Sequence, residues 1–216
     1  MAFGRDETPE KKLTVINARG AAKNYSLNVA ATKWDIQDIK GIPQKKVTPS
    51  AADQNEIGRE RGDLKKALAD KLNKNYWEKG FVMPVKGRIS GHFGGQRIMN
   101  GRKMNPHQGT DIAAPEGTPV KAASNGIVRL SGGNYFYSGN TVVIDHGHQL
   151  FTIYAHLKKV SVKAGDYVRQ GQVIGEVGKT GRVTGPHLHW GASLNGVRFT
   201  PESLLHMNNA DFCFNL

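Results

Sequence analysis

The sequence predicts a mainly β protein: an antiparallel β-sheet domain with barrel-sandwich-like hairpins, preceded by an N-terminal segment with short strands and one helix. Two observations favour strands. The 216 residues include 26 glycines and 9 prolines, the strongest turn-forming residues. From residue 80 onward they separate short runs rich in Val, Ile and Thr, a spacing typical of hairpins. This change of pattern divides the chain into residues 1–80 and 81–216.

The N-terminal segment is expected to begin with two strands. Residues 12–17 and 25–29 alternate apolar and polar side chains, as half-buried strands do. Residues 34–43 follow and end in a turn signal, Gly-Ile-Pro. So few strands do not form a stable sheet alone. We therefore expect this segment to pack on the following domain or to be the end of a larger module.

One helix is predicted over residues 51–75. Ser50 with Asp53 three residues later resembles a capping box, in which each side chain binds the other residue's backbone. Gly58 and Gly62 weaken the prediction, because glycine disfavours helix interiors. Apolar side chains recur at helical spacing, at Ile57, Leu64, Leu68 and Leu72.

The domain after residue 80 contains four clear strand patterns, at residues 126–130, 140–144, 150–154 and 172–175. Residues 163–175 have glycines where a chain must reverse tightly between strands. This segment resembles the barrel-sandwich hairpin of lipoyl and biotinyl carrier domains. A carrier function does not fit, because the sequence lacks the context in which such domains display a modifiable lysine.

Five side chains suited to metal binding or proton transfer stand in three short clusters. His107 and Asp111 are four residues apart, His187 and His189 are two apart, and His156 lies between these pairs. Prolines and glycines around the first pair argue against a helix, so we expect extended chain there. On a strand, residues an even number apart point to the same face, so one sheet face could collect both pairs.

The neighbours of the second pair support this geometry. Leu188 and Trp190 alternate with the two histidines and would point the other way, into a core. A lone histidine is usually a surface or hydrogen-bonded residue, and an Asp near Gly and Pro usually caps a turn. A turn cap would explain Asp111 alone, but not its pairing with suitably placed imidazoles. The remaining histidines are given no role: His92, His146, His148 and His206.

Catalytic zinc takes three protein ligands from His and carboxylate groups and leaves one position open for water. Two imidazoles and one carboxylate from these clusters form a suitable set. The other two histidines are then free for proton chemistry.

Three motifs together resemble the M23 family of zinc metallopeptidases, the lysostaphin-type endopeptidases that cut peptidoglycan. They are His107-x-x-x-Asp111, Tyr154-x-His156-Leu157 and Gly185-Pro-His-Leu-His-Trp190, and the similarity extends over about residues 81–205. The resemblance implies that His107, Asp111 and His189 bind one zinc ion. It also implies that His156 and His187 lie on either side of the reacting water. None of these five positions departs from the family pattern.

The implied function is zinc-dependent hydrolysis of peptide crosslinks in bacterial peptidoglycan. Substrates of the family are crosslinks between stem peptides, either a D-alanyl bond to diaminopimelate or a glycine bridge, and the sequence does not separate the two. Tyr135, on a glycine-rich loop, and Tyr154, two residues before His156, are candidate contacts for the stem peptide.

Two alternatives remain open at this point. The chain could be a non-catalytic module that binds the cell wall or activates another hydrolase, although such modules are expected to lack some of the five residues. It could also be a latent enzyme whose groove is covered by residues 1–80. Retention of all five residues favours an active enzyme.

Charge limits the possible partners. The formal net charge is +12, which attracts polyanions. No helix-turn-helix, zinc-finger or RNA-binding signature favours nucleic acid, whereas the cell wall carries anionic groups. The expected partner is therefore the peptidoglycan stem peptide, and the oligomeric state is not predicted.

Compartment is inferred from the substrate. The single cysteine, Cys213, excludes a disulfide within the chain, and no apolar stretch has membrane-spanning length. Residues 1–12 are charged and polar, without a signal-peptide core. Because peptidoglycan lies outside the cytoplasm, we expect an exported, periplasmic or cell-envelope protein whose signal has been removed or lies beyond this sequence.

Overall fold

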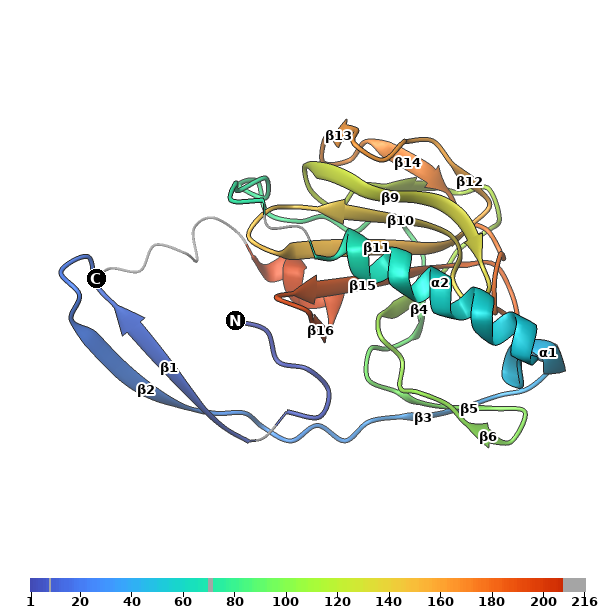
Figure 1. Ribbon diagram of the computed structural model, residues 1–216, viewed down its shortest axis with the longest axis horizontal. Coiled ribbons are helices and arrows are strands. Elements are labelled where there is room, and N and C mark those ends of the chain that lie inside the picture. Colours follow the sequence, from blue (N-terminus) through green and yellow to red (C-terminus); the bar gives the residue numbers. More distant parts are fainter. Residues whose placement is uncertain (8, 70–71, 208–216) are drawn as a thin grey trace.

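The computed structural model describes residues 1–7, 9–69 and 72–207. An eight-stranded antiparallel sheet forms the body, in the order β13-β9-β10-β11-β15-β7-β4, with β16 also paired to β15 (Figure 1). Its strands are β4 (Arg88–Gly91), β7 (Thr110–Ala113), β9 (Gly126–Tyr135), β10 (Gly139–Asp145), β11 (Leu150–Leu157), β13 (Tyr167–Val168), β15 (His187–Leu194) and β16 (Val197–Phe199).

The central strands are buried on both faces. Val142, Ile144 and Tyr154 face the main core, whereas Val143 and Ile153 face a second apolar cluster. This alternation follows from the period of two in an extended chain. All eight residues of β11 are buried, so this strand lies at the centre of the fold.

Two three-stranded sheets complete the domain. One joins β12 (Lys159–Val160), β14 (Val173–Glu176) and β8 (Pro119–Lys121). The other joins β3 (Ile36–Ile39), β5 (Gln96–Met99) and β6 (Arg102–Lys103), and β3 runs parallel to β5. The mainly β prediction is confirmed, as are the four strand patterns after residue 80, each of which overlaps a strand.

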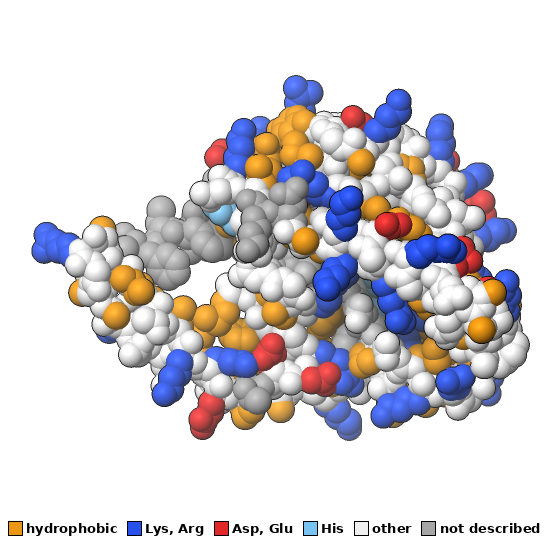
Figure 2. Space-filling view, in the orientation of Figure 1, with side chains coloured by type: hydrophobic (Ala, Val, Ile, Leu, Met, Phe, Trp, Pro, Cys, Tyr) orange, Lys and Arg blue, Asp and Glu red, His pale blue; other side chains and the backbone are white. Residues whose placement is uncertain are grey.

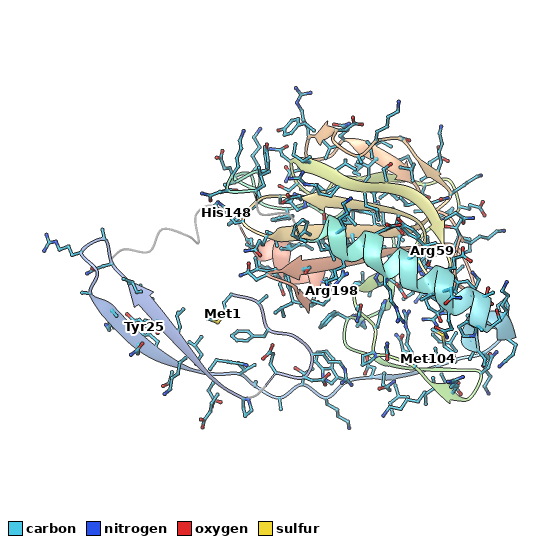
Figure 3. All side chains as sticks on the ribbon, viewed as in Figure 1. Met1, Tyr25, Arg59, Met104, His148 and Arg198 are labelled. Carbon is cyan, nitrogen blue, oxygen red and sulfur yellow. The ribbon has the colours of Figure 1, made fainter. Side chains whose placement is uncertain are left out.

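The N-terminal strands form a hairpin that projects from the body. It consists of β1 (Glu10–Ile16) and β2 (Ala22–Asn28), and Tyr25 lies on it, away from the large sheet (Figures 1 and 3). Both predicted strands are confirmed, with bounds shifted by one to three residues. The chain returns through β3, which adds a strand to β5, so the N-terminal segment does pack on the domain that follows.

Helix α2 (Ala51–Ala67), preceded by the short α1 (Gln44–Val47), begins as the sequence predicts. The Asp53 N–H donates to the Ser50 hydroxyl (3.2 Å) and the Ser50 N–H donates to the Asp53 carboxylate (3.1 Å), so the capping box is present. The helix lies across one face of the sheet, where Leu64 and Ala67 pack on the second apolar cluster (Figure 1).

The predicted end of this helix, at residue 75, was wrong. The helix ends at Ala67, and Leu72 instead lies beside the turn between β10 and β11. There the Leu72 carbonyl accepts from the His148 N–H (2.8 Å) and the Tyr76 N–H donates to the His146 carbonyl (3.0 Å). These tertiary hydrogen bonds replace those that a longer helix would make.

The chain surface is basic, and Figure 2 shows Lys and Arg side chains spread over the visible face with fewer acidic ones. A 3₁₀ helix, η1 (Pro201–His206), follows the last strand. Cys213 lies outside the described residues. Among the described helices, none has the length and apolar character needed to cross a membrane.

Candidate active site

Strand pairing brings two of the predicted groups together. In the register of β7 with β15, His189 lies directly opposite Asp111, and on the other side of β15 it lies opposite Ala155 of β11. Directly opposed residues of an antiparallel pair have adjacent side chains. His187 and His189 share one face of β15, whereas Leu188 and Trp190 are fully buried in the core, as predicted.

His107 reaches the same place from irregular chain before β7. The segment is not helical, in agreement with the sequence, but His107 does not lie on a strand. Gly109 allows this approach, because a Cβ there would lie 2.5 Å from the Trp190 carbonyl oxygen. The chain can therefore cross close to β15 only with glycine at this position.

Three lone-pair atoms meet at the centre of the site. His107 Nε2 lies 3.0 Å from Asp111 Oδ1, His189 Nδ1 lies 2.9 Å from the same oxygen, and the two nitrogens are 3.0 Å apart. The ligand atoms of these residues all lie within 4.8 Å of one another. Within the described part of the chain, no other group of three His, Cys, Asp or Glu residues is so arranged.

Backbone carbonyls fix the tautomers of three histidines. Nδ1–H of His107 donates to the His92 carbonyl, that of His156 to the Thr180 carbonyl and that of His187 to the Gly185 carbonyl, each at 2.9 Å. Because a carbonyl only accepts, Nδ1 must carry the proton, and Nε2 of each neutral ring keeps its lone pair. An atom set of this kind suits a cation, since metal-bound imidazole donates its other N–H in the same way.

His156 and His187 adjoin the three-residue cluster. Their ring centroids are 4.7 Å apart, and the His156 ring lies 5.9 Å from that of His189. His187 Nε2 lies 3.7 Å from Asp111 Oδ1. The structure therefore brings all five predicted groups together.

Tyr154 does not face this site, and the expectation that it contacts a substrate was wrong. Its side chain is fully buried in the main core, where its hydroxyl accepts from the Ala123 N–H (2.9 Å). The sequence argument assumed that Tyr154 and His156 share a strand face. His156 has a φ of 65°, in the left-handed region, and this breaks the alternation.

Burial and contact shift the pKa values of the site. Burial alone would raise the pKa of Asp111, but contact with the His107 and His189 rings outweighs it and holds the pKa well below its ordinary value. Burial lowers the pKa of His189 to about 4, against the opposing effect of Asp111. Burial and the neighbouring histidines also hold the pKa of His156 well below its ordinary value. Both rings are therefore neutral, with lone pairs available, near pH 7.

The site opens into a cavity of about 490 Å³, which is large enough for a small ligand. His107, His156 and His189 line it, and helix α2 supplies Ile57 as part of another wall. Tyr135 also lines this cavity, with its hydroxyl 3.4 Å from the Asp63 carboxylate, and its contact with a substrate stays a prediction.

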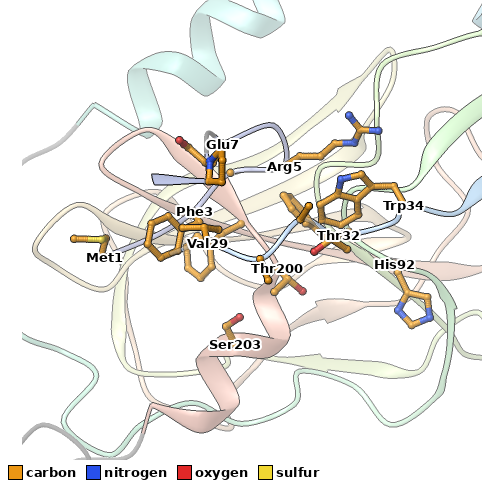
Figure 4. Close-up of a pocket in the computed structure, with 16 residues that line it drawn as sticks. Met1, Phe3, Arg5, Glu7, Val29, Thr32, Trp34, His92, Thr200 and Ser203 are labelled. Carbon is orange, nitrogen blue, oxygen red and sulfur yellow. The ribbon is translucent and has the colours of Figure 1, made fainter. Parts of the chain in front are cut away.

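A second cavity, of about 530 Å³, lies between the N-terminal segment and the domain (Figure 4). Phe3, Trp34 and Thr200 are among its lining residues, and it contains only His92 of the eight histidines. Since the five predicted groups are elsewhere, we place the functional site in the smaller cavity.

Two arginines of the site were not found from the sequence. Arg97 of β5 forms an ion pair with Asp111, and Arg182 lines the same cavity from the loop before β15. Arg182 stands five residues before His187, so its closeness in sequence was the one available signal. The sequence held no such signal for Arg97, because the approach of Arg97 to Asp111 depends on how strand β5 packs.

Comparison with known proteins places the site in a family context. The model of peptidase family M23 matches residues 105–201, the range that contains all five groups. A Pseudomonas aeruginosa protein of known crystal structure, assigned to peptidase M23, is 33% identical with a TM-score of 0.72. The match covers 93% of this chain and 75% of that one.

Two curated relatives come from Vibrio cholerae. Peptidoglycan DD-endopeptidase ShyC is 38% identical over 154 residues, which cover 67% of this chain and 35% of ShyC. Peptidoglycan DD-endopeptidase ShyA is 47% identical over 117 residues, which cover 54% of this chain and 27% of ShyA. The chain thus spans about a third or less of these relatives.

Proposed function

Given that the chain belongs to peptidase family M23, we propose that it is a zinc-dependent endopeptidase that hydrolyses peptide crosslinks of bacterial peptidoglycan. The observation that carries the proposal is the meeting of His107 Nε2, Asp111 Oδ1 and His189 Nδ1 within 4.8 Å, beside two further histidines in one cavity. The Vibrio relatives are named as peptidoglycan endopeptidases, which supports the choice of substrate.

The donor set supports zinc as the metal. Two imidazole nitrogens and one carboxylate oxygen form the ligand set of many catalytic zinc sites, which keep a further position open. When bound, zinc would polarise a peptide carbonyl and lower the pKa of water toward ~7, so that water can attack near neutral pH. His107, Asp111 and His189 would hold it.

His156 and His187 would handle the protons of the reaction. Each has Nδ1–H fixed on a backbone carbonyl, so Nε2 is the atom that can accept a proton from the attacking water. One ring would take this proton, and the other would donate to the oxyanion and then to the leaving amine.

The remaining parts of the proposal concern groove, domain and compartment. Residues 81–216 supply all five groups, whereas residues 1–80 contribute Ile57, Glu60, Arg61 and Leu64 to the cavity wall. We therefore assign catalysis to residues 81–216 and groove shaping to residues 1–80, with Tyr135 as a substrate contact. Peptidoglycan lies outside the cytoplasm, so the site of action would be the periplasm or cell envelope.

Digestion of purified crosslinked peptidoglycan tests the function. Zinc-loaded protein is incubated with the polymer, with and without a chelator, beside His187→Ala, and the released peptides are identified by mass. We expect loss of crosslinked peptides with the zinc-loaded protein and none with the chelator or the variant. Unchanged crosslinks with zinc-loaded protein would overturn the proposal and favour a wall-binding module.

A further inference from the structure

Arg182 presents a partly buried positive charge to the proposed active-site groove. It lines the same cavity as His107, His156 and His189. Its loop is tied to the site, because the carbonyl of Thr180, two residues earlier, holds the His156 ring. A group bound by Arg182 would therefore lie beside the proposed reaction centre.

The guanidinium is held in place without an acidic partner. Its central carbon lies 4.2 Å from the centroid of the Tyr137 ring, and Nη1 makes one long hydrogen bond, 3.4 Å, to the Lys46 carbonyl. No carboxylate of the described residues forms an ion pair with it. Glu60 lines the same cavity, but its carboxylate accepts from the Phe136 N–H at 2.7 Å.

This arrangement differs from that of Arg97, which lines the same cavity. Arg97 already has a carboxylate partner, because it forms an ion pair with Asp111. Burial is the largest cause that lowers the pKa of Arg182; Tyr137 opposes it, and the positive charge of Arg97 adds to it. A guanidinium has five N–H donors in one plane, and stacking on a ring leaves its edges free. A partly buried cation without a carboxylate partner is most stable with an anion in the cavity.

We propose that Arg182 is a specificity-determining residue that binds a carboxylate of the substrate next to the scissile amide. This inference rests on the proposed function and names the crosslink class. In a crosslink to diaminopimelate, the carbon that bears the linking amine keeps a free carboxylate, whereas the interior of a glycine bridge has no charge. Arg182 therefore selects crosslinks whose amine side carries a carboxylate.

Two synthetic crosslinked peptides that differ only in this carboxylate test the proposal, one with the free acid and one with the carboxamide. We expect zinc-loaded protein to cleave the acid with a kcat/KM about 10- to 100-fold higher, the range of one charge-assisted hydrogen bond. Arg182→Gln should bring the ratio close to one by slowing only the acid, and Arg182→Lys should keep part of the preference. Arg59→Gln, at an exposed position of α2, removes the same charge outside the groove and should leave the ratio unchanged.

Calorimetric binding of the two amine products gives a measurement independent of cleavage. Tighter binding of the acid, lost in Arg182→Gln, supports the proposal even if neither peptide is cleaved, an outcome that would sink only the hydrolase function. The proposal for Arg182 is overturned if the unmodified protein cleaves, or binds, the acid and the carboxamide equally. An equal loss on both peptides in Arg182→Gln, with unchanged melting temperature, overturns it as well.

Discussion

The guanidinium of Arg97 pairs with Oδ2 of Asp111, while Oδ1 of the same carboxylate faces His107 and His189. Nε–H of Arg97 also donates to the side-chain oxygen of Gln37 (3.4 Å), which lies on strand β3 of the N-terminal segment. The two oxygens of Asp111 thus have different partners, and its carboxylate is held in one orientation. Groups that orient a ligand in this way strengthen metal binding.

Replacing Arg97 by glutamine should weaken zinc binding by about 10- to 100-fold, the usual effect of losing an orienting partner. Competition with a chromophoric chelator measures this affinity. Arg102→Gln is the matched control, because Arg102 lies on the neighbouring strand β6 and is exposed. An affinity unchanged by Arg97→Gln would show that the ion pair does not orient Asp111.

His156→Ala and His187→Ala should each keep the metal yet lower the rate of crosslink cleavage by about 10²- to 10⁴-fold, the usual contribution of a positioned acid or base. Both residues lie beside the three-residue cluster but outside it. Metal content and kcat are measured on the same sample. Loss of the metal in either variant, or near-normal cleavage, would contradict the proposed division of roles.

His146 should make stability depend on pH. It is fully buried, with Nδ1–H donated to the Asn125 carbonyl (2.6 Å) and Nε2 2.7 Å from the Thr152 hydroxyl, and burial lowers its pKa to about 4. The unfolded chain binds the proton more readily, so this stability is complete above pH ~6.5 and is lost as the pH falls toward 4. The loss should approach about 3 kcal/mol.

Urea unfolding between pH 4 and 8 measures this dependence. His146→Gln should be less stable at pH 7 and show a flatter profile, whereas His148→Gln, in the same turn but exposed, should retain the wild-type slope. A wild-type slope in His146→Gln would assign the effect to other groups.

Removal of residues 1–80 should destabilise the remaining domain. Helix α2 covers Val143, Phe151 and Ile153 of the sheet, and exposing such side chains costs about 3 kcal/mol or more. Thermal unfolding compares this version with one in which a glycine linker replaces only residues 10–28 of the projecting hairpin. Equal melting temperatures for the short version and the full chain would show that α2 adds no stability.

The sequence predicted those parts of the site that depend on local periodicity. Alternation placed His187 and His189 on one face and Leu188 and Trp190 in the core, because β15 is regular there. The same rule failed for Tyr154, since one left-handed residue, His156, interrupts the period. Local periodicity carries no sign of such a break.

Other features depend on contacts between distant segments. The helix pattern continued to Leu72, but hydrogen bonds with the β10–β11 turn take the chain out of the helix at Ala67. The position of Arg97 depends on the packing of β5, which pairs in parallel with β3 from far away in the sequence. The site of Arg182 depends on stacking against Tyr137. None of these contacts has a repeating pattern in the sequence.

Metal stoichiometry by native mass spectrometry tests the central claim most directly. After zinc loading and removal of excess metal, the full chain should carry one zinc ion, and the variant His107→Ala, Asp111→Ala, His189→Ala should carry none while keeping its fold. A full chain that retains no zinc, or a triple variant that retains as much as the full chain, would contradict the assignment of these three residues as the metal site.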